Sequence, residues 1–387
     1  MGRTAAMILA GGQGKRMGIL CIQTPKPALP FGGRFQVMDF SLSNCLESGI
    51  DNIAAVTDYQ RLSMADYLTR WSSENERSNR SELSILEPRN GHYLGTADAV
   101  YQNIQYLVDN QVETVLVLAA DHIYKMDYRE LLTFHSAKQA DVTVGILPVK
   151  LKDAVRFGSV KLDAERRILD FAEKAASPLS NLISMGIYAF SVPALFRRLQ
   201  EDAGMPGSAH DFGYSIIPDM VRKDKAFAFR FNGYWRDIGT TEAYYAANMD
   251  YLYQGPSNRS LEILPTFGDG KAQSGALKAY SSEKIRNSLI SPGCLIGGFV
   301  ENSILSPGVV VEEHAIVKNS ILMDNVFIAD HSRVESAIIG KRANVSRYCR
   351  IGEPDSFQGS KVVAVLGEDA VVLREHEGIE MQVAAAY

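Results

Sequence analysis

The sequence predicts an α/β domain with a Rossmann-like, mostly parallel sheet, followed by a parallel β-helix built from hexapeptide repeats. In the first two thirds of the chain, short apolar runs alternate with longer segments of helical spacing, which is typical of buried parallel strands joined by helices. In the last third, apolar residues recur at intervals of five to six residues or multiples of them, which is typical of stacked coils. At 387 residues the chain exceeds one typical core, so two domains are expected.

The first domain is predicted to span residues 1–255 as a doubly wound fold. Its buried strands are expected in four short apolar runs, at residues 5–10, 52–57, 114–120 and 141–149. Between these runs, residues 40–49 and 96–110 have helical apolar spacing, and Thr96 is expected to cap the second of these helices. The alternation of the two patterns therefore predicts one layered α/β domain.

A stretch rich in Gly, Pro and Ser at 251–276 predicts a linker over residues 256–280. The pentapeptides "RNSLI", "ENSIL" and "KNSIL" follow it at spacings of 15 and 17 residues, nearly three hexapeptides per repeat. A β-helix domain with a C-terminal tail is therefore predicted over 281–387. Because repeat stacks mostly present surfaces, an oligomerisation module is favoured over an acyltransferase site, and His314 and His331 are expected to be solvated loop residues.

Composition excludes several classes of protein. The chain is 46% apolar and 22% charged, and its apolar runs fall far below the roughly 18 residues of a membrane span, so no transmembrane helix and a cytoplasmic location are expected. A net charge of -5 argues against a nucleic-acid surface. The four cysteines form no C-x-x-C pair or short His/Cys cluster, so buried reduced thiols are expected rather than a zinc site or disulfides.

The segment "LAGGQGKRM" places a glycine-rich loop directly after the first predicted strand. It is not a Walker A loop, because Leu9 stands at the first glycine position and Arg16 follows the lysine. It is not a dinucleotide fingerprint either, because Met17 occupies the third glycine position. The remaining pattern, three glycines followed by two cations, lets backbone N–H groups approach anionic oxygens; a plain strand turn is the alternative. Lys26, held between two prolines, adds a stiff cation.

The segments "LAGGQGKRM" and "PKPALPFGG" resemble the start of the sugar nucleotidylyltransferases, and specifically the glucose-1-phosphate adenylyltransferase (ADP-glucose pyrophosphorylase) family. The blocks "GTADAVYQN", "DHIYKMDY", "SMGIYAF" and "YWRDIGT" resemble the same family in its order and with similar spacing. The resemblance implies a nucleotidyltransferase domain with a left-handed β-helix. It also implies that ATP and glucose 1-phosphate are joined to give ADP-glucose and pyrophosphate for glycogen or another α-glucan, by a homotetramer that uses Mg2+.

The resemblance also assigns roles to residues. Asp121, which follows the strand at 114–120, and Asp237 in "YWRDIGT" are implied to be the Mg2+ ligands, since hard oxygen donors suit this ion. The implied catalytic residues are Arg16, Lys26 and Asp121. The implied nucleotide-binding residues are Leu9, Gly11, Gly12, Gly14, Lys15, Gly95 and Thr96. The implied sugar-binding residues are Gly158, Glu173, Lys174 and Ser184.

The chain departs from the family pattern near the nucleotide. Leu94 stands where the family usually has Gln or Arg, His92 replaces a Trp, and Asp58 replaces a Gln. Relatives that handle guanine or uracil nucleotides also use "LGTA", so a related enzyme with another base or sugar, such as one making GDP-mannose, is a second hypothesis. A regulatory subunit of an ADP-glucose pyrophosphorylase is a third, and a bifunctional acetyltransferase is a fourth.

Overall fold

The computed structural model describes residues 3–76, 82–89, 91–254, 278–279, 282–353 and 363–374. The chain divides into two compact units. The first unit comprises Met1–Gly12, Ser41–Ala120 and Lys125–Gly233. The second unit comprises Gln13–Phe40, Asp121–Tyr124 and Tyr234–Tyr387. Most of the predicted linker at 256–280, and the predicted tail after residue 374, lie outside the described residues, so the boundary between residues 255 and 281 stays a prediction.

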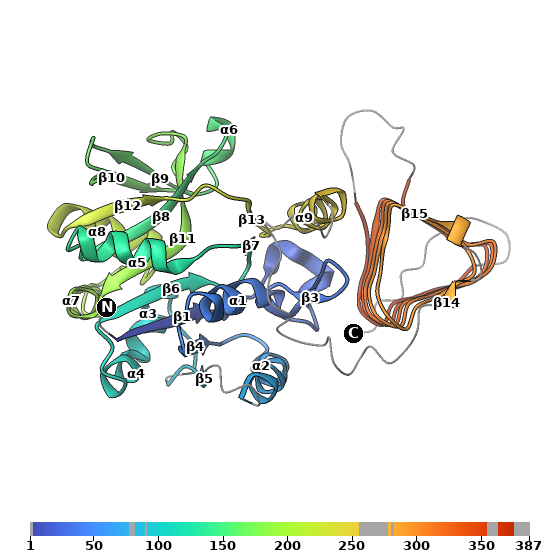
Figure 1. Cartoon of the computed structure of the whole chain (residues 1–387), viewed down its shortest axis with the longest axis horizontal. Helices are drawn as coiled ribbons and strands as arrows, with labels where there is room; N and C mark the ends of the chain where they lie inside the picture. Colours follow the sequence, from blue (N-terminus) through green and yellow to red (C-terminus); the bar gives the residue numbers. More distant parts are fainter. Residues whose placement is uncertain are drawn as a thin grey trace. The chain divides into compact units, whose positions relative to one another are not determined.

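Among the described residues, nine strands form the central sheet of the first unit (Figure 1). They are β1 (Thr4–Leu9), β4 (Asn52–Val56), β5 (Glu82–Leu86), β6 (Thr114–Ala119), β8 (Val142–Pro148), β9 (Gly158–Leu162), β10 (Ile168–Glu173), β11 (Leu182–Ser191) and β12 (Ala226–Arg230). The order is β10-β9-β11-β6-β1-β4-β5, with β8 paired to β11 and β12. β6, β1, β4 and β5 run parallel, whereas β11 runs antiparallel to β6 and β8. The four predicted strands are confirmed as β1, β4, β6 and β8.

The helices of this part of the chain follow the strands that they connect. They are α1 (Asp39–Glu47), α2 (Arg61–Glu76), α3 (Thr96–Gln102), α4 (Ile104–Asp109), α5 (Tyr128–Ala137), α6 (Leu151–Ala154), α7 (Val192–Ala203), α8 (Ile217–Lys223) and the π-helical turn η3 (Phe212–Ile216). The helix predicted over 96–110 is divided in two at Asn103, whose side-chain amide donates to the Ala99 carbonyl at 2.9 Å and to the Tyr93 hydroxyl at 2.8 Å. A side chain that bonds to the backbone in this way competes with helix continuation.

The predicted cap of α3 is wrong. Gly95, not Thr96, occupies the N-cap position and makes no side-chain cap. The free N–H groups of Ala97 and Asp98 donate instead to the His210 carbonyl, at 2.8 and 3.2 Å. A carbonyl from a distant segment thus satisfies the helix terminus that a local side chain was expected to satisfy.

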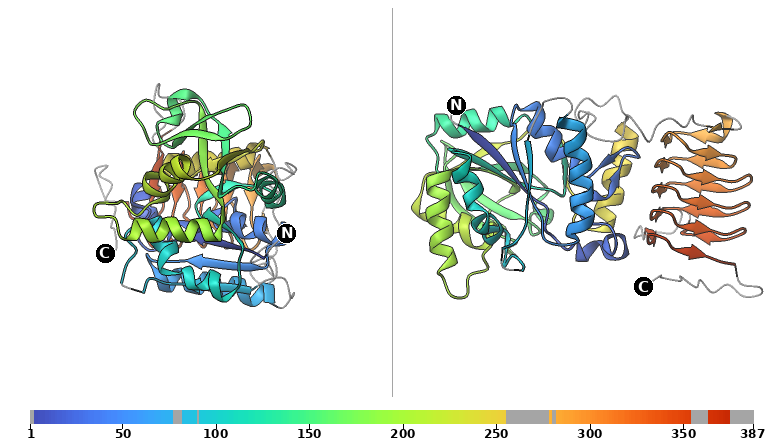
Figure 2. Two further views of the ribbon diagram at one scale, coloured as in Figure 1. Left: turned by 90° about the vertical axis from the view of Figure 1, so that its left-hand side faces the viewer. Right: turned by 90° about the horizontal axis from the view of Figure 1, so that it is seen from below.

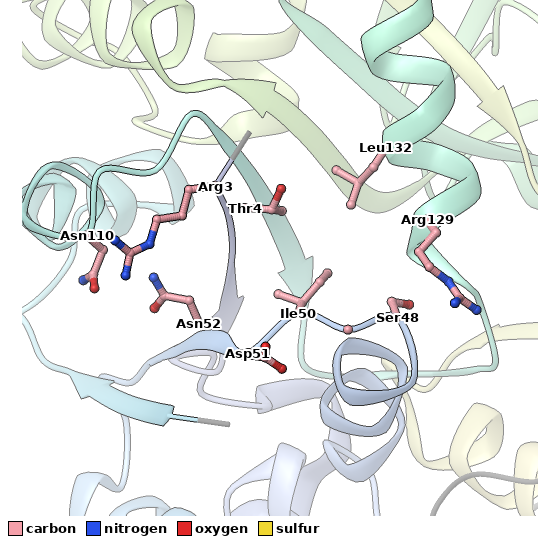
Figure 3. A pocket seen from close by; sticks show the side chains of 10 residues that line it. Arg3, Thr4, Ser48, Ile50, Asp51, Asn52, Asn110, Arg129 and Leu132 are labelled. Atoms are coloured by element: carbon pink, nitrogen blue, oxygen red, sulfur yellow. The ribbon is translucent and has the colours of Figure 1, made fainter. Parts of the chain in front are cut away.

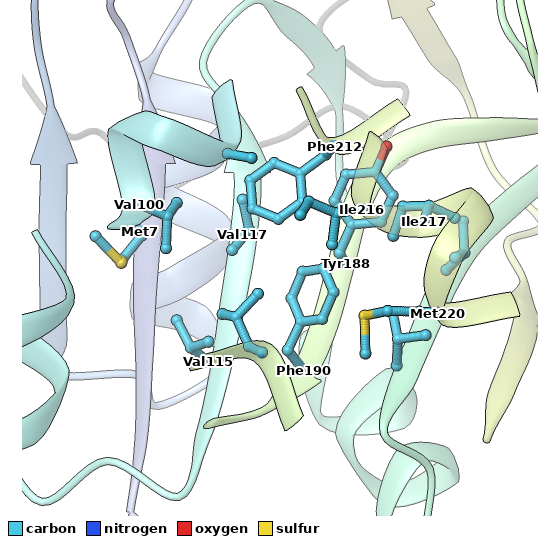
Figure 4. Packing of buried hydrophobic residues seen from close by; sticks show 14 of the residues in the cluster. Met7, Val100, Val115, Val117, Tyr188, Phe190, Phe212, Ile216, Ile217 and Met220 are labelled. Atoms are coloured by element: carbon cyan, nitrogen blue, oxygen red, sulfur yellow. The ribbon is translucent and has the colours of Figure 1, made fainter. Parts of the chain in front are cut away.

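The core of the first unit lies between the sheet and the helices packed on it. Tyr188 and Phe190 of β11 lie against Phe212 of η3, with ring centroids 5.8 and 5.4 Å from Phe212 (Figure 4). Val115 and Val117 of β6 are fully buried in the same cluster. Each such side chain contributes about 1.5 to 3 kcal/mol when it is removed from water. This packing fixes β11 and η3, which carry residues of the candidate site.

The second unit joins an N-terminal segment, a short strand pair and a helix to the β-helix. These elements are η1 (Lys15–Cys21), η2 (Lys26–Ala28), β2 (Pro30–Phe31), β3 (Phe35–Gln36), β7 (His122–Tyr124), β13 (Trp235–Asp237) and α9 (Thr241–Gln254). The Ser291 hydroxyl of the β-helix donates to the Gly33 carbonyl at 2.5 Å, and the Tyr245 hydroxyl of α9 donates to the Asn319 carbonyl at 2.6 Å. Apolar side chains of all these parts form one core.

The β-helix consists of short parallel strands stacked in three sheets, as predicted; Figure 1 looks along the stack and Figure 2 shows its coils from the side. The first sheet contains β14 (Lys278–Ala279), β17 (Leu295–Ile296), β20 (Val310–Val311), β23 (Phe327–Ile328), β26 (Asn344–Val345) and β29 (Val371–Val372). The second contains β15 (Ile285–Arg286), β18 (Phe299–Glu301), β21 (Ile316–Lys318), β24 (Arg333–Glu335) and β27 (Arg350–Ile351). The third contains β16 (Leu289–Ile290), β19 (Ile304–Leu305), β22 (Ile321–Leu322), β25 (Ala337–Ile339) and β28 (Ala364–Leu366). The 3-10 turn η4 (Ser282–Lys284) precedes β15.

The repeated Asn-Ser pair marks the same corner in three successive coils. Asn302 and Asn319 adopt positive φ angles of 49° and 47°, which asparagine tolerates better than most residues. The following serines are buried, and the Ser303 hydroxyl accepts the Ser320 N–H of the next coil at 3.1 Å. Ala337 donates to the Ser320 hydroxyl in the same way, at 3.2 Å. The pentapeptide repeat therefore encodes a turn and a ladder of hydroxyls.

Two further expectations concern the whole chain. All four cysteines are buried and carry free thiols, as predicted, and burial raises the pKa of Cys21 to about 11. Within the described ranges, no helix combines the length and apolar character that crossing a bilayer requires.

Candidate active site

The glycine-rich loop follows β1, and its glycines are under different constraints. A Cβ at Gly11 would lie 3.0 Å from the Asp58 Cβ, and a Cβ at Gly14 would lie 3.0 Å from the Cys21 sulfur. Gly14 also has a φ angle of 63°, which side chains disfavour. A Cβ at Gly12 would meet nothing within 4 Å, so the backbone there borders open space. The loop thus offers backbone N–H groups where a ligand can approach.

Two exposed cations and one packed residue flank this loop. Lys15 and Arg16 are exposed, and neither forms an ion pair with another described residue. Leu9 is half-buried at the end of β1, packs against the core of the first unit, and accepts the Ala120 N–H through its carbonyl at 3.3 Å. The side chain of Leu9 therefore anchors the start of the loop to the apolar core of the first unit.

In the second unit, Lys26 lies between the two predicted metal ligands. Its Nζ is 2.5 Å from Asp121 Oδ2 and 3.9 Å from Asp237 Oδ1. The carboxylates are 116 residues apart in sequence, but β7 and β13 pair antiparallel so that Asp237 lies opposite His122, the neighbour of Asp121. The N–H of Ile238 also donates to the Asp121 carbonyl at 3.4 Å. One short ladder therefore brings both acids to the same lysine.

Lys26 is held rigidly. Pro25, with φ of −63° and ψ of 144°, precedes the single turn η2, Pro27 follows Lys26 within it, and only 6% of Lys26 is exposed. Burial raises the pKa of Asp121, but the ion pair with Lys26 and the nearby His122 outweigh this effect and hold that pKa well below its usual range. Asp121 is therefore an anion at all physiological pH values.

This group fits a divalent metal ion on the chemistry of its donors. Two carboxylates supply the hard oxygen atoms that Mg2+ prefers. Gly239 completes the fit, because a Cβ there would lie 2.9 Å from Arg16 Nη2 and 3.0 Å from both carboxylate oxygens of Asp237. The absence of a side chain at Gly239 thus keeps a small space beside Asp237 and Arg16. The sequence pattern did not single out Gly239, although it stands two residues after Asp237 in the same block.

The predicted sugar-binding residues gather in the first unit around Glu173. Gly158 is its strand partner, and a Cβ at Gly158 would lie 2.6 Å from Glu173 Oε2. Lys174 adopts a φ angle of 44° and places its Nζ 2.9 Å from Glu173 Oε1 and 5.5 Å from the centre of the Tyr214 ring. Burial lowers the pKa of Lys174, but the bond to Glu173 outweighs this and raises it. Lys174 is therefore a permanent cation beside a carboxylate.

Ser184 and Gly213 complete this group. Ser184 is buried on β11, donates to the Tyr188 hydroxyl at 3.3 Å and accepts the Gly186 N–H at 3.2 Å. A Cβ at Gly213 would lie 2.6 Å from Glu173 Oε2, so this glycine, like Gly158, leaves room for the carboxylate. Sequence reasoning did not single out Gly213, which lies in the segment "HDFG" at residues 210–213.

Gly95 and Thr96 lie against the segment that leads into η3. A Cβ at Gly95 would lie 2.3 Å from the His210 carbonyl oxygen, so this position requires glycine. The Thr96 hydroxyl donates to Asp211 Oδ2 at 2.8 Å and accepts the Phe212 N–H at 3.0 Å. The protein itself therefore uses the Thr96 side chain, which ties the start of α3 to η3.

The departures from the family pattern lie beside the glycine loop in the first unit. Asp58, next to Gly11, contacts His92 Nδ1 at 3.1 Å and accepts the Tyr93 N–H at 3.4 Å. Leu94 is 73% exposed, and its N–H donates to Asp98 at 2.8 Å. An exposed apolar side chain therefore stands where the family resemblance implied a polar one.

A cavity of about 450 Å3 lies elsewhere in the first unit, near the amino ends of β1 and β4 (Figure 3). Its lining includes Arg3, Asn52 and Asn110, and none of the predicted site residues. Arg129 also borders it, but its guanidinium is bound to both carboxylate oxygens of Asp127. The glycine loop follows the opposite, carboxyl end of β1, so this cavity is separate from the candidate active site.

Comparison with known proteins agrees with this arrangement. The family model described as nucleotidyl transferase matches residues 5–254, and the model for the GlmU-like C-terminal hexapeptide matches residues 275–373. Glucose-1-phosphate adenylyltransferase of Geobacillus stearothermophilus is 42% identical over 322 residues, which cover 81% of this chain and 82% of the relative. The chain belongs to the glucose-1-phosphate adenylyltransferase family.

Other members of the glucose-1-phosphate adenylyltransferase family align over comparable lengths. The protein of Desulfitobacterium hafniense strain Y51 is 37% identical over 393 residues, 98% of both chains. That of Thermotoga maritima is 39% identical over 327 residues, 82% of this chain and 77% of the relative. Nucleotidyltransferases generally use a divalent metal.

Proposed function

We propose that this protein joins ATP and glucose 1-phosphate to give ADP-glucose and pyrophosphate, for the synthesis of glycogen or another α-glucan. The observation that carries the proposal is the placement of Lys26 between Asp121 and Asp237. Membership of a family whose members carry the name glucose-1-phosphate adenylyltransferase supports it. Such a group suits phosphoryl transfer, because its cation can neutralise negative charge that develops on phosphate oxygens and its carboxylates can hold a divalent metal ion.

In the proposed reaction, a phosphate oxygen of glucose 1-phosphate attacks the α-phosphorus of ATP. The bond from that phosphorus to the oxygen bridging to the β-phosphate breaks, and pyrophosphate leaves with the bonding electrons. Negative charge on the leaving oxygens must be neutralised, so positioning and electrostatics supply most of the rate. We assign the neutralising role to Arg16 and Lys26.

The remaining contacts to the nucleotide come from the loop and from the start of α3. We assign the triphosphate to the backbone of Gly11, Gly12 and Gly14 with the Lys15 side chain, and the nucleoside side to Leu9, Gly95 and Thr96. Gly12 borders open space, which supports the assignment of the triphosphate to this loop. For Thr96 the contact is assigned to the backbone, because its hydroxyl is already bonded to Asp211.

Asp121 and Asp237 would hold Mg2+, which when bound supplies positive charge to phosphate oxygens. For the sugar phosphate, Lys174 is a cation whose partner Glu173 can accept hydrogen bonds from sugar hydroxyls. Gly158 leaves space beside that carboxylate, and Ser184 offers a buried hydroxyl on the adjacent strand. We therefore assign substrate binding in the first unit to these four residues.

We further propose a cytoplasmic homotetramer whose β-helix serves assembly rather than acyl transfer. Light scattering coupled to size-exclusion chromatography measures the assembly directly. Four times the chain mass of 42.6 kDa is expected, and a monomer would contradict the proposal.

The deciding experiment measures pyrophosphate release with Mg2+ and glucose 1-phosphate against ATP, UTP, GTP, CTP and dTTP. Release with ATP alone is expected, and Asp121→Asn should lower it by about 1,000-fold because a charged group at the reacting phosphates is lost. Asp109→Asn, an exposed acid at the end of α4, is the matched control and should leave release unchanged. Release with another nucleotide would show that the enzyme is specific for a nucleotide with a different base. No release with any nucleotide and a wider panel of sugar phosphates would favour a regulatory subunit.

A further inference from the structure

One corner of the β-helix carries a cluster of side chains that the proposed reaction does not use. His314 lies between β20 and β21, and Asp330 and His331 lie one coil further on, between β23 and β24. Asp330 Oδ1 is 3.1 Å from His314 Nδ1 and 2.8 Å from His331 Nδ1. One ligand atom from each of the three residues lies within 4.8 Å of the other two.

The backbone fixes this arrangement. Pairing of Val311 with Ile328 and of Ile316 with Arg333 sets a register of 17 residues on both sides of the corner, so His331 stacks on His314. The two histidines have φ angles of 57° and 60°, and their ring centroids are 4.6 Å apart. The two rings lie next to each other at an interplanar angle of 34°, on backbone positions that the strand pairing on both sides of the corner fixes.

The same corner is enlarged in the coils that carry the cluster. In the earlier coil, only Gly297 and Gly298 separate β17 from β18. In the next two coils, four residues fill the corresponding corner, 312–315 and then 329–332. These two additional residues account for the change in register from 15 to 17. The lengthening of the coil thus creates the corner that holds His314, Asp330 and His331.

We propose that His314, Asp330 and His331 form a binding site for a divalent transition-metal ion such as Zn2+, which would join two successive coils. Two imidazole nitrogens and one carboxylate oxygen form a ligand set that binds Zn2+ in preference to Mg2+ or Ca2+, because the latter two ions favour oxygen ligands alone. With bonds of about 2.1 Å, the ligand atoms of a tetrahedral site lie about 3.4 Å apart. The observed separations, up to 4.8 Å, need only small side-chain rotations to reach this value.

The surroundings of the cluster agree with a three-ligand site. Glu312 accepts the Asp330 N–H through Oε2 at 2.9 Å, which holds the turn in place. Tyr348 lies in the coil that follows His331, and the centres of the two rings are 5.0 Å apart. The Tyr348 ring therefore covers one side of the cluster. The side chains of His314 and His331 are 64% and 44% exposed, so the ion could enter from solvent and keep one coordination position open.

The test uses the untagged full-length protein, treated with a chelator and then dialysed. Isothermal titration with ZnCl2, in excess MgCl2 that competes for sites made only of oxygen, should give one high-affinity site per chain. His314→Gln and His331→Gln should each weaken binding by at least about 100-fold, since loss of a ligand exceeds the 10- to 100-fold effect of losing a supporting residue. His92→Gln is the matched control, because His92 pairs with Asp58 in the first unit at the same 3.1 Å but has no second histidine within that pair.

Two further measurements keep the proposal falsifiable if a variant folds poorly. CoCl2 added to the unsubstituted protein should give the visible absorption of a low-coordinate nitrogen and oxygen site. ZnCl2 should also raise its melting temperature, and the double variant His314→Gln/His331→Gln should lose that rise. Equal ZnCl2 binding by the double variant, or no binding and no cobalt spectrum in the unsubstituted protein, would overturn the proposal and leave the cluster as a hydrogen-bonded surface network.

Discussion

The carboxylate cluster at Lys26 and the histidine cluster of the β-helix are both assembled by strand register, but at different distances along the chain. Asp121 and Asp237 meet through a single three-residue ladder across 116 residues. His314 and His331 meet because the two coils that carry them pair at a register of 17 residues on both sides of the corner. The first arrangement depends on a few unique contacts, whereas the second is distributed over many equivalent ones. Substitutions should therefore affect the two clusters very differently.

The largest expected effect comes from removing the cation of the carboxylate cluster. Lys26→Ala leaves Asp121 and Asp237 without their shared partner and should lower kcat/KM for pyrophosphate release by about 1,000-fold. Lys152→Ala, an exposed lysine of α6, should leave kcat/KM unchanged. A loss of less than tenfold in Lys26→Ala would show that this cluster does not serve the reaction.

A smaller loss of activity is expected from filling the space beside Asp237. Gly239→Ala places a Cβ 3.0 Å from both Asp237 carboxylate oxygens and displaces them or Arg16. Because misplacement by about 1 Å can cost about 100-fold, kcat should fall by that order while the melting temperature changes little. Gly204→Ala is the control, since the nearest atom to its Cβ would be 3.8 Å away. Equal kcat in both variants would contradict this interpretation.

The coil stack should respond through stability rather than activity. Val317 is fully buried between Val300 and Val334 of the adjacent coils, and Val317→Ala should lower the free energy of unfolding by about 2 kcal/mol. Val371→Ala removes the same atoms from a side chain that is 42% exposed and should change this energy by less than about 0.5 kcal/mol. Urea unfolding measures both, and indistinguishable midpoints would argue against a closely packed stack.

The smallest expected effect is the pH dependence of stability that comes from His135, which is buried, unlike His314 and His331. His135 in α5 is buried with its Nδ1 2.9 Å from the Thr143 hydroxyl, and burial lowers its pKa to about 4. In the unfolded chain this histidine binds a proton near pH 6.5, whereas in the folded chain it stays neutral until the pH approaches 4. The free energy of unfolding should therefore be constant above pH 6.5 and decrease as the pH drops toward 4. At pH 5.5 the loss should be about 1.4 kcal/mol.

The matched variants separate this buried histidine from the exposed ones. Urea unfolding at pH 5.5 and pH 7.5 should show a smaller pH dependence in His135→Gln, because the group that resists protonation is removed. His314→Gln should keep the full dependence, because the buried His135 side chain is unchanged in that variant. A pH dependence that is unchanged in His135→Gln would contradict the assignment to this side chain.

Local patterns in the sequence predicted much of the fold. The apolar runs predicted β1, β4, β6 and β8, and the repeat spacing predicted the coils, because in both cases the pattern itself is the cause of the structure. The cap of α3 was predicted wrongly because the His210 carbonyl, more than 110 residues away, replaced a local side chain. The antiparallel course of β11 was not predicted either, since strand direction depends on connections rather than on composition.

In the candidate site too, the sequence predicted local features but not the contacts between distant segments. The glycine loop and Lys26 are visible as local chemistry, but the meeting of Asp121 with Asp237 depends on the β7–β13 ladder, for which the sequence holds no repeat. Gly239 was missed because its role is the space that it leaves. The histidine cluster was missed although its signal was present, since the 17-residue spacing of the last two Asn-Ser pairs equals the separation of His314 and His331.

Variable coil length has a consequence for how this domain can change. The register between neighbouring coils is 15 residues at Leu295, 17 at Val310 and 27 at Ala337, yet the paired strands stay aligned. Length added at a corner therefore leaves the ladder beside it undisturbed. The corner between the first and second sheets and the corner between the second and third sheets vary in length from coil to coil. These two corners are permissive sites for insertion, where evolution or an engineer can add a binding loop while the interior of the stack stays as it was.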